Sequence, residues 1–290
     1  MAQRKRSHLW RTQNFLRHSA DAERLIERAG LTLDDLVVEI GAGAGNLTEL
    51  LAVRCRRVVA IEKDEALCRA LRHRLSSRTN VVIRCGNFRQ FRLPRTPYKV
   101  FSNPPFDVTA EIVTTLTRAT LPPKDAFLVM QKEAADRFMG RPKETLAALL
   151  LKPWFAPAVF HGFIPHDFAP APGVDVVMFR LRKRGPPLIE EDLGRLYRDF
   201  VTACFTAWQP TVDRALARVL GQVATRALLA HVDIHLGVRP SELALAGWLS
   251  LFRAFAQLPA SLTSRVAGAN AHQRRQQRRL RKCHRTRRSA

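Results

Sequence analysis

The sequence predicts an α/β protein with a doubly wound sheet, a small all-helical domain after it and a disordered basic tail at its end. Three observations predict this order: short β-branched runs alternate with helical stretches over the first two-thirds of the chain, a Gly-Pro-Pro break follows, and helical patterning then continues toward an Arg-rich end. Strand–helix alternation is typical of sheets whose strands are joined by crossover helices. We therefore predict domains over residues 1–183 and 184–264, and a tail over residues 265–290.

The strands of the sheet are predicted from five apolar or β-branched runs, with helix-like segments between them. The predicted strands are 36–40, 57–62, 81–85, 99–102 and 126–130, and the predicted helices are 47–54, 65–74 and 109–119. Two later apolar runs, 160–165 and 174–181, have no clear helix between them. We expect these two runs to form an antiparallel pair at one edge of the sheet.

The domain boundary is predicted where three basic residues precede Gly185-Pro186-Pro187, because glycine and proline interrupt regular structure. From Glu190 to about Gln257 the pattern is helical. Residues 265–290 hold ten Lys or Arg and no acid. With so few apolar residues this segment cannot bury enough surface to fold alone, so we predict a disordered arm.

The charge of the chain predicts a polyanionic partner. Lys and Arg number 48 against 25 acids, which gives a formal charge of +23 and a pI near 11.3. Nucleic acid is the favoured partner, and an anionic membrane surface is the alternative. No run reaches the roughly 18 apolar residues that span a bilayer, and no apolar segment follows the basic N-terminus as in a secretory signal. We therefore expect a cytoplasmic, monomeric protein.

The cysteines predict neither a disulfide framework nor a metal site. They are five in number, scattered and without a C-x-x-C pair: Cys55, Cys68, Cys85, Cys204 and Cys283. We expect them to be reduced, and we assign no metal ligand.

A glycine-rich turn after the first predicted strand indicates a nucleoside site. Gly41, Gly43 and Gly45 follow the run Val37–Ile40 and lead into a helix. Glycines allow a backbone to approach a ligand closely. Glu62, at the end of the next strand, is placed to accept both ribose hydroxyls. A tight turn without a ligand is the alternative interpretation of the glycines.

The spacing of these residues favours S-adenosylmethionine over a dinucleotide. The motif is G-x-G-x-G, and the third glycine of a dinucleotide motif would fall on Asn46. Glu39, two residues before Gly41, is expected to repel a pyrophosphate, whereas the cationic end of S-adenosylmethionine tolerates a carboxylate. After the third strand, Asn87 is a candidate to bond the adenine of the cofactor and Phe88 to pack near its ring, although this tripeptide with Gly86 also fits a simple turn.

The end of the fourth strand carries the chemistry, in the stretch Ser102-Asn103-Pro104-Pro105-Phe106. Ligands of open α/β sheets bind at strand ends. The prolines fix the backbone, and Asn103 is held extended because a proline follows it. The Asn103 side-chain oxygen and the Pro104 carbonyl can then accept from one amine, which localises the nitrogen lone pair for attack on the sulfonium methyl. The alternative is a proline-rich turn before the next helix.

Phe106 adds a stacking face for the base that carries this amine, which is worth about 1–3 kcal/mol. A paired base could not reach the site, so the target must be single-stranded or flipped out of its helix.

These motifs together resemble the ribosomal RNA adenine N6-methyltransferases, which include the erythromycin-resistance (Erm) methylases and the small-subunit rRNA adenine dimethyltransferases. The resemblance covers residues 11–260 and begins with Gln13-Asn14-Phe15-Leu16. It implies that Gln13, Asn14 and Leu16 belong to the cofactor pocket. The resemblance also implies that five residues discussed above bind the cofactor: Gly41, Gly43, Glu62, Asn87 and Asn103.

Two further segments follow the same family pattern. Residues 131–137 match its Q-x-E-x-A-x-R helix, and residues 165–175 match its P-x-x-F-x-P-x-P-x-V-[DN] segment. In the second segment the resemblance implies that Phe168 is another aromatic flanking the target adenine, whereas without it Phe168 is interpreted as a core residue. Asn87 and Pro104 depart from the usual Asp and Ile or Leu, which leaves the target and the number of methyl groups open.

The resemblance implies S-adenosylmethionine-dependent methylation of an adenine in rRNA. The Arg-rich tail and composition favour the Erm branch, whose target is in 23S rRNA and whose product confers macrolide, lincosamide and streptogramin B resistance. A 16S rRNA adenine dimethyltransferase is the alternative. A DNA adenine methyltransferase and a non-catalytic nucleic-acid-binding protein on the same scaffold are the other hypotheses.

Overall fold

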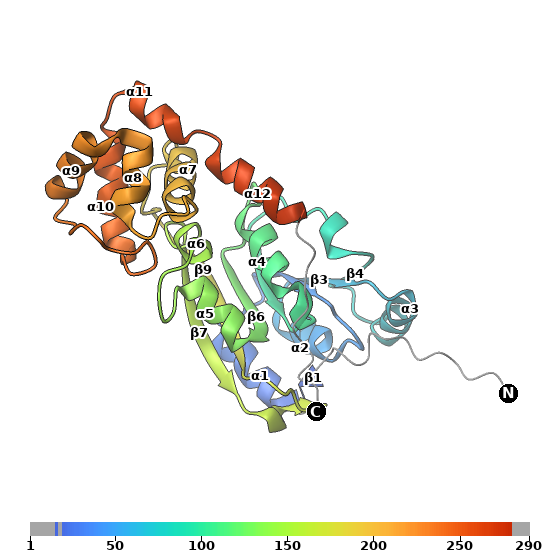
Figure 1. The fold of residues 1–290 in the computed structure, drawn as a ribbon. Helices are drawn as coiled ribbons and strands as arrows, with labels where there is room; N and C mark the ends of the chain where they lie inside the picture. Colours follow the sequence, from blue (N-terminus) through green and yellow to red (C-terminus); the bar gives the residue numbers. More distant parts are fainter. Residues whose placement is uncertain (1–14, 17–18, 280–290) are drawn as a thin grey trace. The chain divides into compact units, whose positions relative to one another are not determined.

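The computed structural model describes residues 15–16 and 19–279. Its centre is a seven-stranded mixed sheet in the order β4-β3-β2-β5-β6-β9-β7, with helices on both sides (Figure 1). The first five strands in this order pair in parallel, and β9 runs antiparallel to β6. This is the doubly wound α/β fold that the alternating sequence predicted, so the predicted fold class is confirmed.

The strands have nearly the bounds that their apolar runs predicted, except that β7 begins five residues before the predicted run 160–165 and ends two residues before its end. They are β2 (Leu36–Ile40), β3 (Arg57–Glu62), β4 (Val81–Cys85), β5 (Lys99–Ser102), β6 (Asp125–Gln131), β7 (Phe155–Phe163) and β9 (Val176–Lys183). The two late runs form β7 and β9, which are neighbours at one edge of the sheet. A short second sheet pairs β1 (Phe15–Leu16) with β8 (Phe168–Ala169).

In the described part of the chain six α-helices precede β7, and the first ones pack their apolar sides on the sheet. They are α1 (Ser19–Arg28), α2 (Asn46–Arg54), α3 (Glu65–Arg74), α4 (Thr109–Thr117), α5 (Lys132–Met139) and α6 (Leu146–Leu149). Leu25 of α1 and Leu51 of α2 are buried in one cluster with Phe101 and Phe127 from neighbouring strands. Burial of this kind contributes roughly 1.5–3 kcal/mol per large side chain and fixes where each strand ends.

The chain divides into two compact units. The first contains Met1–Ala135 and Ala156–Lys183, and the second contains Asp136–Phe155 and Arg184–Ala290. The second unit begins again after Lys183, where the domain boundary was predicted, but it also takes residues 136–155, which the prediction left in the first domain. The reason is packing: Leu149 of α6 is buried in the helical core, and its carbonyl accepts from the Tyr197 hydroxyl at 3.0 Å.

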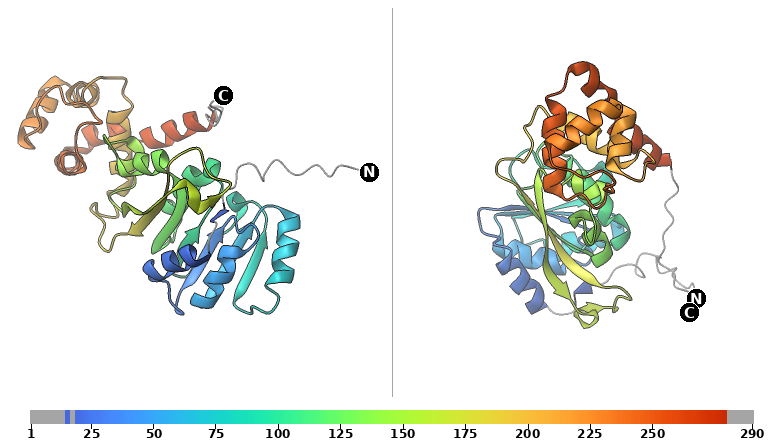
Figure 2. Two further views of the ribbon diagram at one scale, coloured as in Figure 1. Left: turned by 90° about the horizontal axis from the view of Figure 1, so that it is seen from below. Right: turned by 60° about the vertical axis from the view of Figure 1, so that its left-hand side comes forward.

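The second unit is helical (Figures 1 and 2). Its remaining helices are α7 (Gly194–Phe205), α8 (Val212–Leu220), α9 (Gln222–His231), α10 (Leu245–Ala256), α11 (Ala260–Thr263) and α12 (Ala269–Arg279). Its core is aromatic, with Phe200 stacked on Phe255 at 4.4 Å and Tyr197 edge-on to Phe252 at 5.1 Å.

The prediction of a disordered arm from residue 265 is corrected for its first part. Residues 264–266 form a short 3-10 helix, η5, and residues 269–279 form α12, while residues 280–290 lie outside the described structure. The buried Asp199 of α7 accepts from the backbone N–H groups of Gly268 at 3.0 Å and Asn270 at 2.9 Å. The first backbone N–H groups of a helix have no partner within the helix, and the Asp199 carboxylate accepts from those at the start of α12.

The cysteine prediction is also corrected. Cys68 of α3 and Cys85 at the end of β4 form a disulfide. Since β3 and β4 pair with Glu62 opposite Cys85, and α3 follows Glu62 directly, the fold brings the two sulfurs together. Cys55 and Cys204 are buried and free.

Two features are absent from the residues that the structure describes. None of the helices they form is both long and apolar enough to cross a bilayer. No group of three or more His, Cys, Asp or Glu side chains in that part of the chain is placed to hold a metal ion.

Candidate functional site

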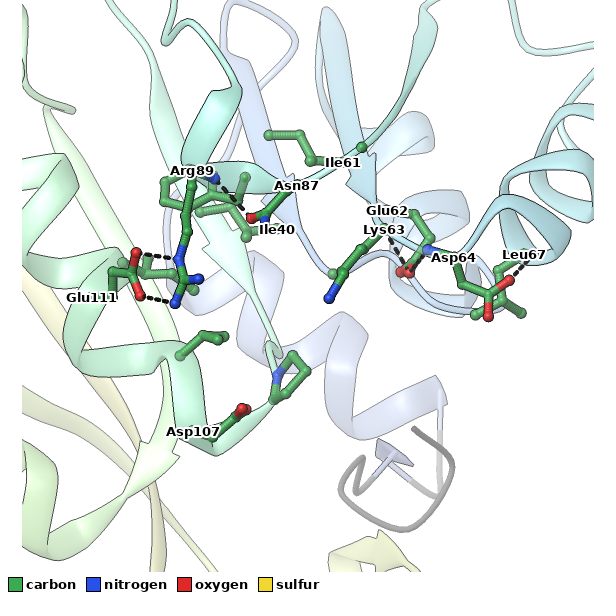
Figure 3. Close-up of a pocket in the computed structure, with 16 residues that line it drawn as sticks. Ile40, Ile61, Glu62, Lys63, Asp64, Leu67, Asn87, Arg89, Asp107 and Glu111 are labelled. Carbon is green, nitrogen blue, oxygen red and sulfur yellow. Dashed lines mark hydrogen bonds and ion pairs between the residues drawn. The ribbon is translucent and has the colours of Figure 1, made fainter. Parts of the chain in front are cut away.

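A pocket of about 260 Å³ lies at the carboxyl ends of the parallel strands (Figure 3). Residues at or just after the ends of β2, β3, β4 and β5 all contribute to it. They include Gly41, Glu62, Asn87, Phe88 and Pro105. Strand ends on both sides of β2 meet here, which is where open α/β sheets bind ligands.

The glycine turn needs glycines for its backbone conformation. Gly41, Gly43 and Gly45 have φ angles of 82°, 58° and 89°, in the left-handed region that side chains disfavour. The N–H of Gly41 donates to the Ile61 carbonyl at 2.8 Å, which holds the turn against β3. A Cβ on Gly41 would lie 3.4 Å from Cδ of Pro105 and 3.6 Å from Cα of Pro104. The turn and the Asn103–Phe106 stretch therefore lie side by side, with little room for a side chain between them.

Glu62 is held rigidly at the rim of the pocket. Its Oε2 accepts from the Gly43 N–H at 2.9 Å, and its Oε1 accepts from the N–H groups of Lys63 at 2.8 Å and Asp64 at 2.9 Å. A carboxylate offers about four acceptor positions, so these three bonds leave capacity for a ligand hydroxyl. The predicted ribose-binding acid is thus preorganised by the glycine turn itself.

Glu39 has a different role from the one that its position predicted. The carboxyl group is buried beneath the turn, where the Thr48 hydroxyl donates to it at 2.6 Å. Burial raises the pKa of Glu39 to about 8, with a further contribution from the charge of Glu62 and an opposing one from Thr48. At pH 7 most of the carboxyl is therefore protonated. The expectation that Glu39 repels a pyrophosphate loses its basis, since that repulsion requires a charge.

The wall after β4 contains the residue predicted to contact adenine. Asn87 lines the pocket and caps the short 3-10 helix η2 (Phe88–Gln90), its Oδ1 accepting from the Arg89 N–H at 3.0 Å. The side-chain NH₂ group and the second lone pair of Oδ1 are available to a ligand from that position. Phe88 also lines the pocket, as predicted for a residue near the adenine ring.

Sequence reasoning missed an ion pair on the pocket wall. The Arg89 guanidinium donates to both carboxylate oxygens of Glu111 on α4, at 2.5 and 2.6 Å (Figure 3). These hydrogen bonds and the charge of Glu111 raise the pKa of Arg89. The two residues are 22 positions apart, and neither belongs to a motif, so the pairing exists only in the folded chain. It joins the segments after β4 and β5.

The Asn103–Phe106 stretch is rigid at both ends. Before it, the Ser102 hydroxyl donates to the Ile40 carbonyl at 2.5 Å and accepts from the Ile40 N–H at 3.0 Å, which ties the end of β5 to the end of β2. After it, the Thr109 hydroxyl donates to the Phe106 carbonyl at 2.9 Å. Pro104 is buried between them. The backbone is thus fixed as the two prolines predicted.

The predicted catalytic residues lie beside the pocket rather than on its walls. Pro105 is part of the lining, whereas Asn103, Pro104 and Phe106 adjoin it. Asn103 and Phe106 are half-buried, and Phe106 packs against the cluster that contains Phe101 and Phe127. Such a position suits residues that hold a second molecule against the ligand in the pocket.

Phe168 is fully buried and packs edge-on against Phe163, with ring centroids 5.1 Å apart. In this structure it presents no ring face to solvent, which matches the core interpretation of this residue. A role beside the target adenine stays a prediction. Of the predicted N-terminal residues, Gln13 and Asn14 lie outside the described residues, and Leu16 belongs to β1, paired with Phe168 of β8.

Comparisons with known proteins show what the chain as a whole is similar to. A family model described as ribosomal RNA adenine dimethylase matches residues 4–257. The chain is 34% identical over 208 residues to the ribosomal RNA small subunit methyltransferase A of Thermotoga petrophila, across 70% of this chain and 77% of that protein. It is 31% identical over 246 residues to the rRNA adenine N-6-methyltransferase of Saccharopolyspora erythraea, across 83% of this chain and 63% of that protein.

Solved structures with the same fold cover most of the chain. The crystal structure of the 23S rRNA methyltransferase ErmE has a TM-score of 0.76 and 30% identity, covering 84% of this chain and 100% of its own. A dimethyladenosine transferase from Plasmodium falciparum has a TM-score of 0.72 and 19% identity, covering 84% and 98%. The second likeness is one of fold alone.

Proposed function

The chain belongs to the ribosomal RNA adenine dimethylase family, and from this premise we propose that it methylates N6 of one adenine in 23S rRNA. The enzyme is an S-adenosylmethionine-dependent rRNA adenine methyltransferase, and its product confers resistance to macrolides, lincosamides and streptogramin B. One observation carries the proposal: the glycine turn lies beside the rigid Asn103–Phe106 stretch, so that Gly41 and Pro105 line the same pocket.

The pocket fits the cofactor by its donor set. Glu62 retains an acceptor position for a ribose hydroxyl, Asn87 offers amide donors and an acceptor to an adenine edge, and Phe88 offers an apolar ring. Gly41 leaves the turn free of side-chain atoms next to Pro105. When bound, S-adenosylmethionine supplies an electrophilic methyl group. Gln13, Asn14 and Leu16 are proposed to complete its site.

Asn103 and Pro104 hold the target amine. The Asn103 side-chain oxygen and the Pro104 carbonyl each accept a hydrogen bond from one N–H of this amine. These two bonds favour a tetrahedral nitrogen with a localised lone pair. No side chain need be tuned as a base, because the nitrogen loses its proton readily once it carries the methyl group. The contribution of these residues is positioning, which can supply roughly 7–11 kcal/mol of a barrier.

Phe106 is proposed to stack on the adenine that Asn103 holds. It is half-buried against the core beneath it, so its ring is fixed before the base arrives. A rigid aromatic loses little conformational entropy on binding, and base stacking contributes about 1–3 kcal/mol.

The choice of 23S rather than 16S rRNA rests on three similarities to the Erm branch. The ErmE structure matches with 30% identity over 84% of this chain. The relative named rRNA adenine N-6-methyltransferase extends over 83% of the chain, against 70% for the small-subunit methyltransferase. The Arg-rich end of the chain is the third. The alternative, a 16S rRNA adenine dimethyltransferase, is favoured by the 34% identity of the small-subunit relative.

The test is primer extension along 23S and 16S rRNA after incubation with the enzyme and radiolabelled S-adenosylmethionine. We expect one adenine in 23S rRNA to stop the reverse transcriptase and to carry the label. A stop confined to 16S rRNA would assign the alternative target. Label in adenine-containing DNA instead of rRNA, or no transfer to either, would contradict rRNA methylation. Expression in a macrolide-sensitive host tests the resistance phenotype, with Asn103→Ala as the inactive control.

A further inference from the structure

The helical unit contains a second cleft that the proposed reaction does not use. It has a volume of about 950 Å³ and lies where the end of α7 meets η5 (Ser264–Val266) and the first turns of α12. Trp208, Gln209, Arg265, His272 and Arg275 are among its lining residues. Every residue that lines it belongs to the segment 203–276, so the cleft is complete within this unit.

Trp208 is an unusual residue in this cleft. Its side chain is 98% exposed, more than any other large hydrophobic residue that the structure describes. Its φ angle is 57°, in the left-handed region, where bulky side chains are rare. An exposed indole and a strained backbone are both unfavourable for folding, and strain of this kind gathers at ligand-binding positions.

The backbone around Trp208 is held in place on both sides. Before it, the Thr206 hydroxyl donates to the Thr202 carbonyl at 2.7 Å, and Phe205 packs against Trp248. The Ala207 carbonyl accepts from the Arg218 guanidinium at 3.4 Å. After it, the Val212 N–H that begins α8 donates to the Val238 carbonyl at 2.8 Å. The indole is therefore presented outward by a fixed loop.

The rest of the cleft is positively charged. Arg275 is exposed, and no described residue forms an ion pair or hydrogen bond with its side chain. Arg265 donates to the Val219 carbonyl at 3.0 Å, which anchors its guanidinium and leaves other N–H groups open. No Asp or Glu among the described residues lines the cleft. The nearby Asp199 is buried and already bonded to the start of α12.

We propose that this cleft binds an unpaired segment of the RNA substrate, with one base stacked on Trp208 and the adjoining phosphates on Arg275 and Arg265. An aromatic platform beside cations is how proteins hold single-stranded nucleic acid, because every base has a π face and every linkage a charge. The inference rests on the proposed function for the identity of the RNA. It adds a contact that lies outside the methyl-transfer pocket and selects unpaired strands.

The first experiment measures binding of a fluorescein-labelled, mixed-sequence oligoribonucleotide, alone and annealed to its complement. We expect Trp208→Ala to weaken binding of the single strand by about 5- to 150-fold, Trp208→Phe by less than about 3-fold, and neither to change duplex binding appreciably. Val223→Ala, at a residue 85% exposed on α9, is the matched control and should bind like the wild type. Equal single-strand affinity of Trp208→Ala and the wild type would overturn the proposal.

Charge is tested in the same assay by varying the salt concentration. Arg275→Gln should lower the slope of log K against log salt by about 0.7 for the single strand, because binding then neutralises one phosphate fewer and releases fewer counterions. Arg226→Gln removes the same charge from an exposed position on α9 that does not line the cleft. Equal slopes for the two variants would contradict a phosphate contact at Arg275.

The second experiment separates this inference from the proposed function. In methyl transfer to rRNA, Trp208→Ala should raise KM for RNA at least about 5-fold, with kcat and the affinity for S-adenosylmethionine unchanged. An unchanged KM would overturn the inference and leave methylation standing. If the wild type transfers no methyl group while Trp208→Ala still loses single-strand binding, the proposed function fails and the cleft remains an RNA site. Loss of binding only to ribosomal proteins would identify a protein site and overturn the inference.

Discussion

At the scale of single residues, Asn103 is where the proposed chemistry can be tested most directly. Replacing Asn103 with Ala removes one of two acceptors for the target amine, and loss of one such group costs about 10²–10³ in rate when it acts in the transition state. We expect kcat to fall by that factor while binding of RNA stays within a few-fold. Asn103→Asp keeps an acceptor oxygen and should retain more activity than Ala. Turnover by the Ala variant at the wild-type rate would rule out this role.

Glu39 predicts a pH dependence of stability. Because the pKa of Glu39 is raised from 4.5 to about 8, the folded state holds a proton that the unfolded state releases above its own pKa. Stability should therefore fall as pH rises from about 4.5 to about 8 and then level off. Glu39→Gln removes the group that releases this proton on unfolding, and the amide oxygen of Gln can still accept the hydrogen bond from the Thr48 hydroxyl. It should gain stability over the wild type at pH 9 but not at pH 4, by roughly a few kcal/mol.

Thermal unfolding at the two pH values measures this difference. Glu23→Gln, which removes an exposed acid on α1, is the control and should show no comparable gain. If the difference in Tm between Glu39→Gln and the wild type is the same at both pH values, the pKa of Glu39 is not raised in the folded protein.

At the scale of elements, α12 depends on a side chain from another helix. Asp199 of α7 accepts from the backbone N–H groups of Gly268 and Asn270. Asp199→Ala leaves these donors without their acceptor, which costs about 0.5–2 kcal/mol for a lost cap. We expect faster hydrogen exchange across α12, with α10 unchanged. Glu190→Ala, at an exposed acid outside the helices, should leave exchange in α12 as in the wild type. Unchanged exchange in Asp199→Ala would mean that α12 forms without this cap.

At the scale of the whole molecule, the excess of positive charge predicts salt-sensitive binding of RNA. Residues 280–290 carry five basic side chains and no acid. Deleting them should weaken rRNA binding and flatten its salt dependence, by about 0.9 in slope for each phosphate that is no longer neutralised, with kcat unchanged. A Gly/Ser segment of equal length controls for chain length. An unchanged slope would mean that these residues do not contact phosphates.

The sheet was predictable because parallel strands buried on both faces appear as short apolar runs. The bounds of β2, β3, β4 and β5 agree with their runs; the glycine turn follows β2, and Glu62 is the last residue of β3, as expected. Order along the chain then places these residues at one edge, since parallel strands end on the same side. That Gly41 and Pro105 line the same pocket is consistent with this expectation.

The helical end of the chain was harder to predict because its partners are distant in sequence. Residues 136–155 join the helical unit through the burial of Leu149, and α12 is capped by Asp199, 69 positions before Gly268. A composition rich in Arg and Gln predicts only that the segment cannot fold alone, which does not exclude folding against α7.

The sequence by itself determined the fold class, the turn after β2 and the rigid stretch after β5, because local patterns of apolar residues, glycine and proline dictate backbone geometry. Only the tertiary structure decided the protonation of Glu39, the burial of Phe168, the Arg89–Glu111 pair and the outward display of Trp208. Each of these depends on what surrounds a side chain in three dimensions. Desolvation, ion pairing and exposure arise from neighbours that the order of residues along the chain does not reveal.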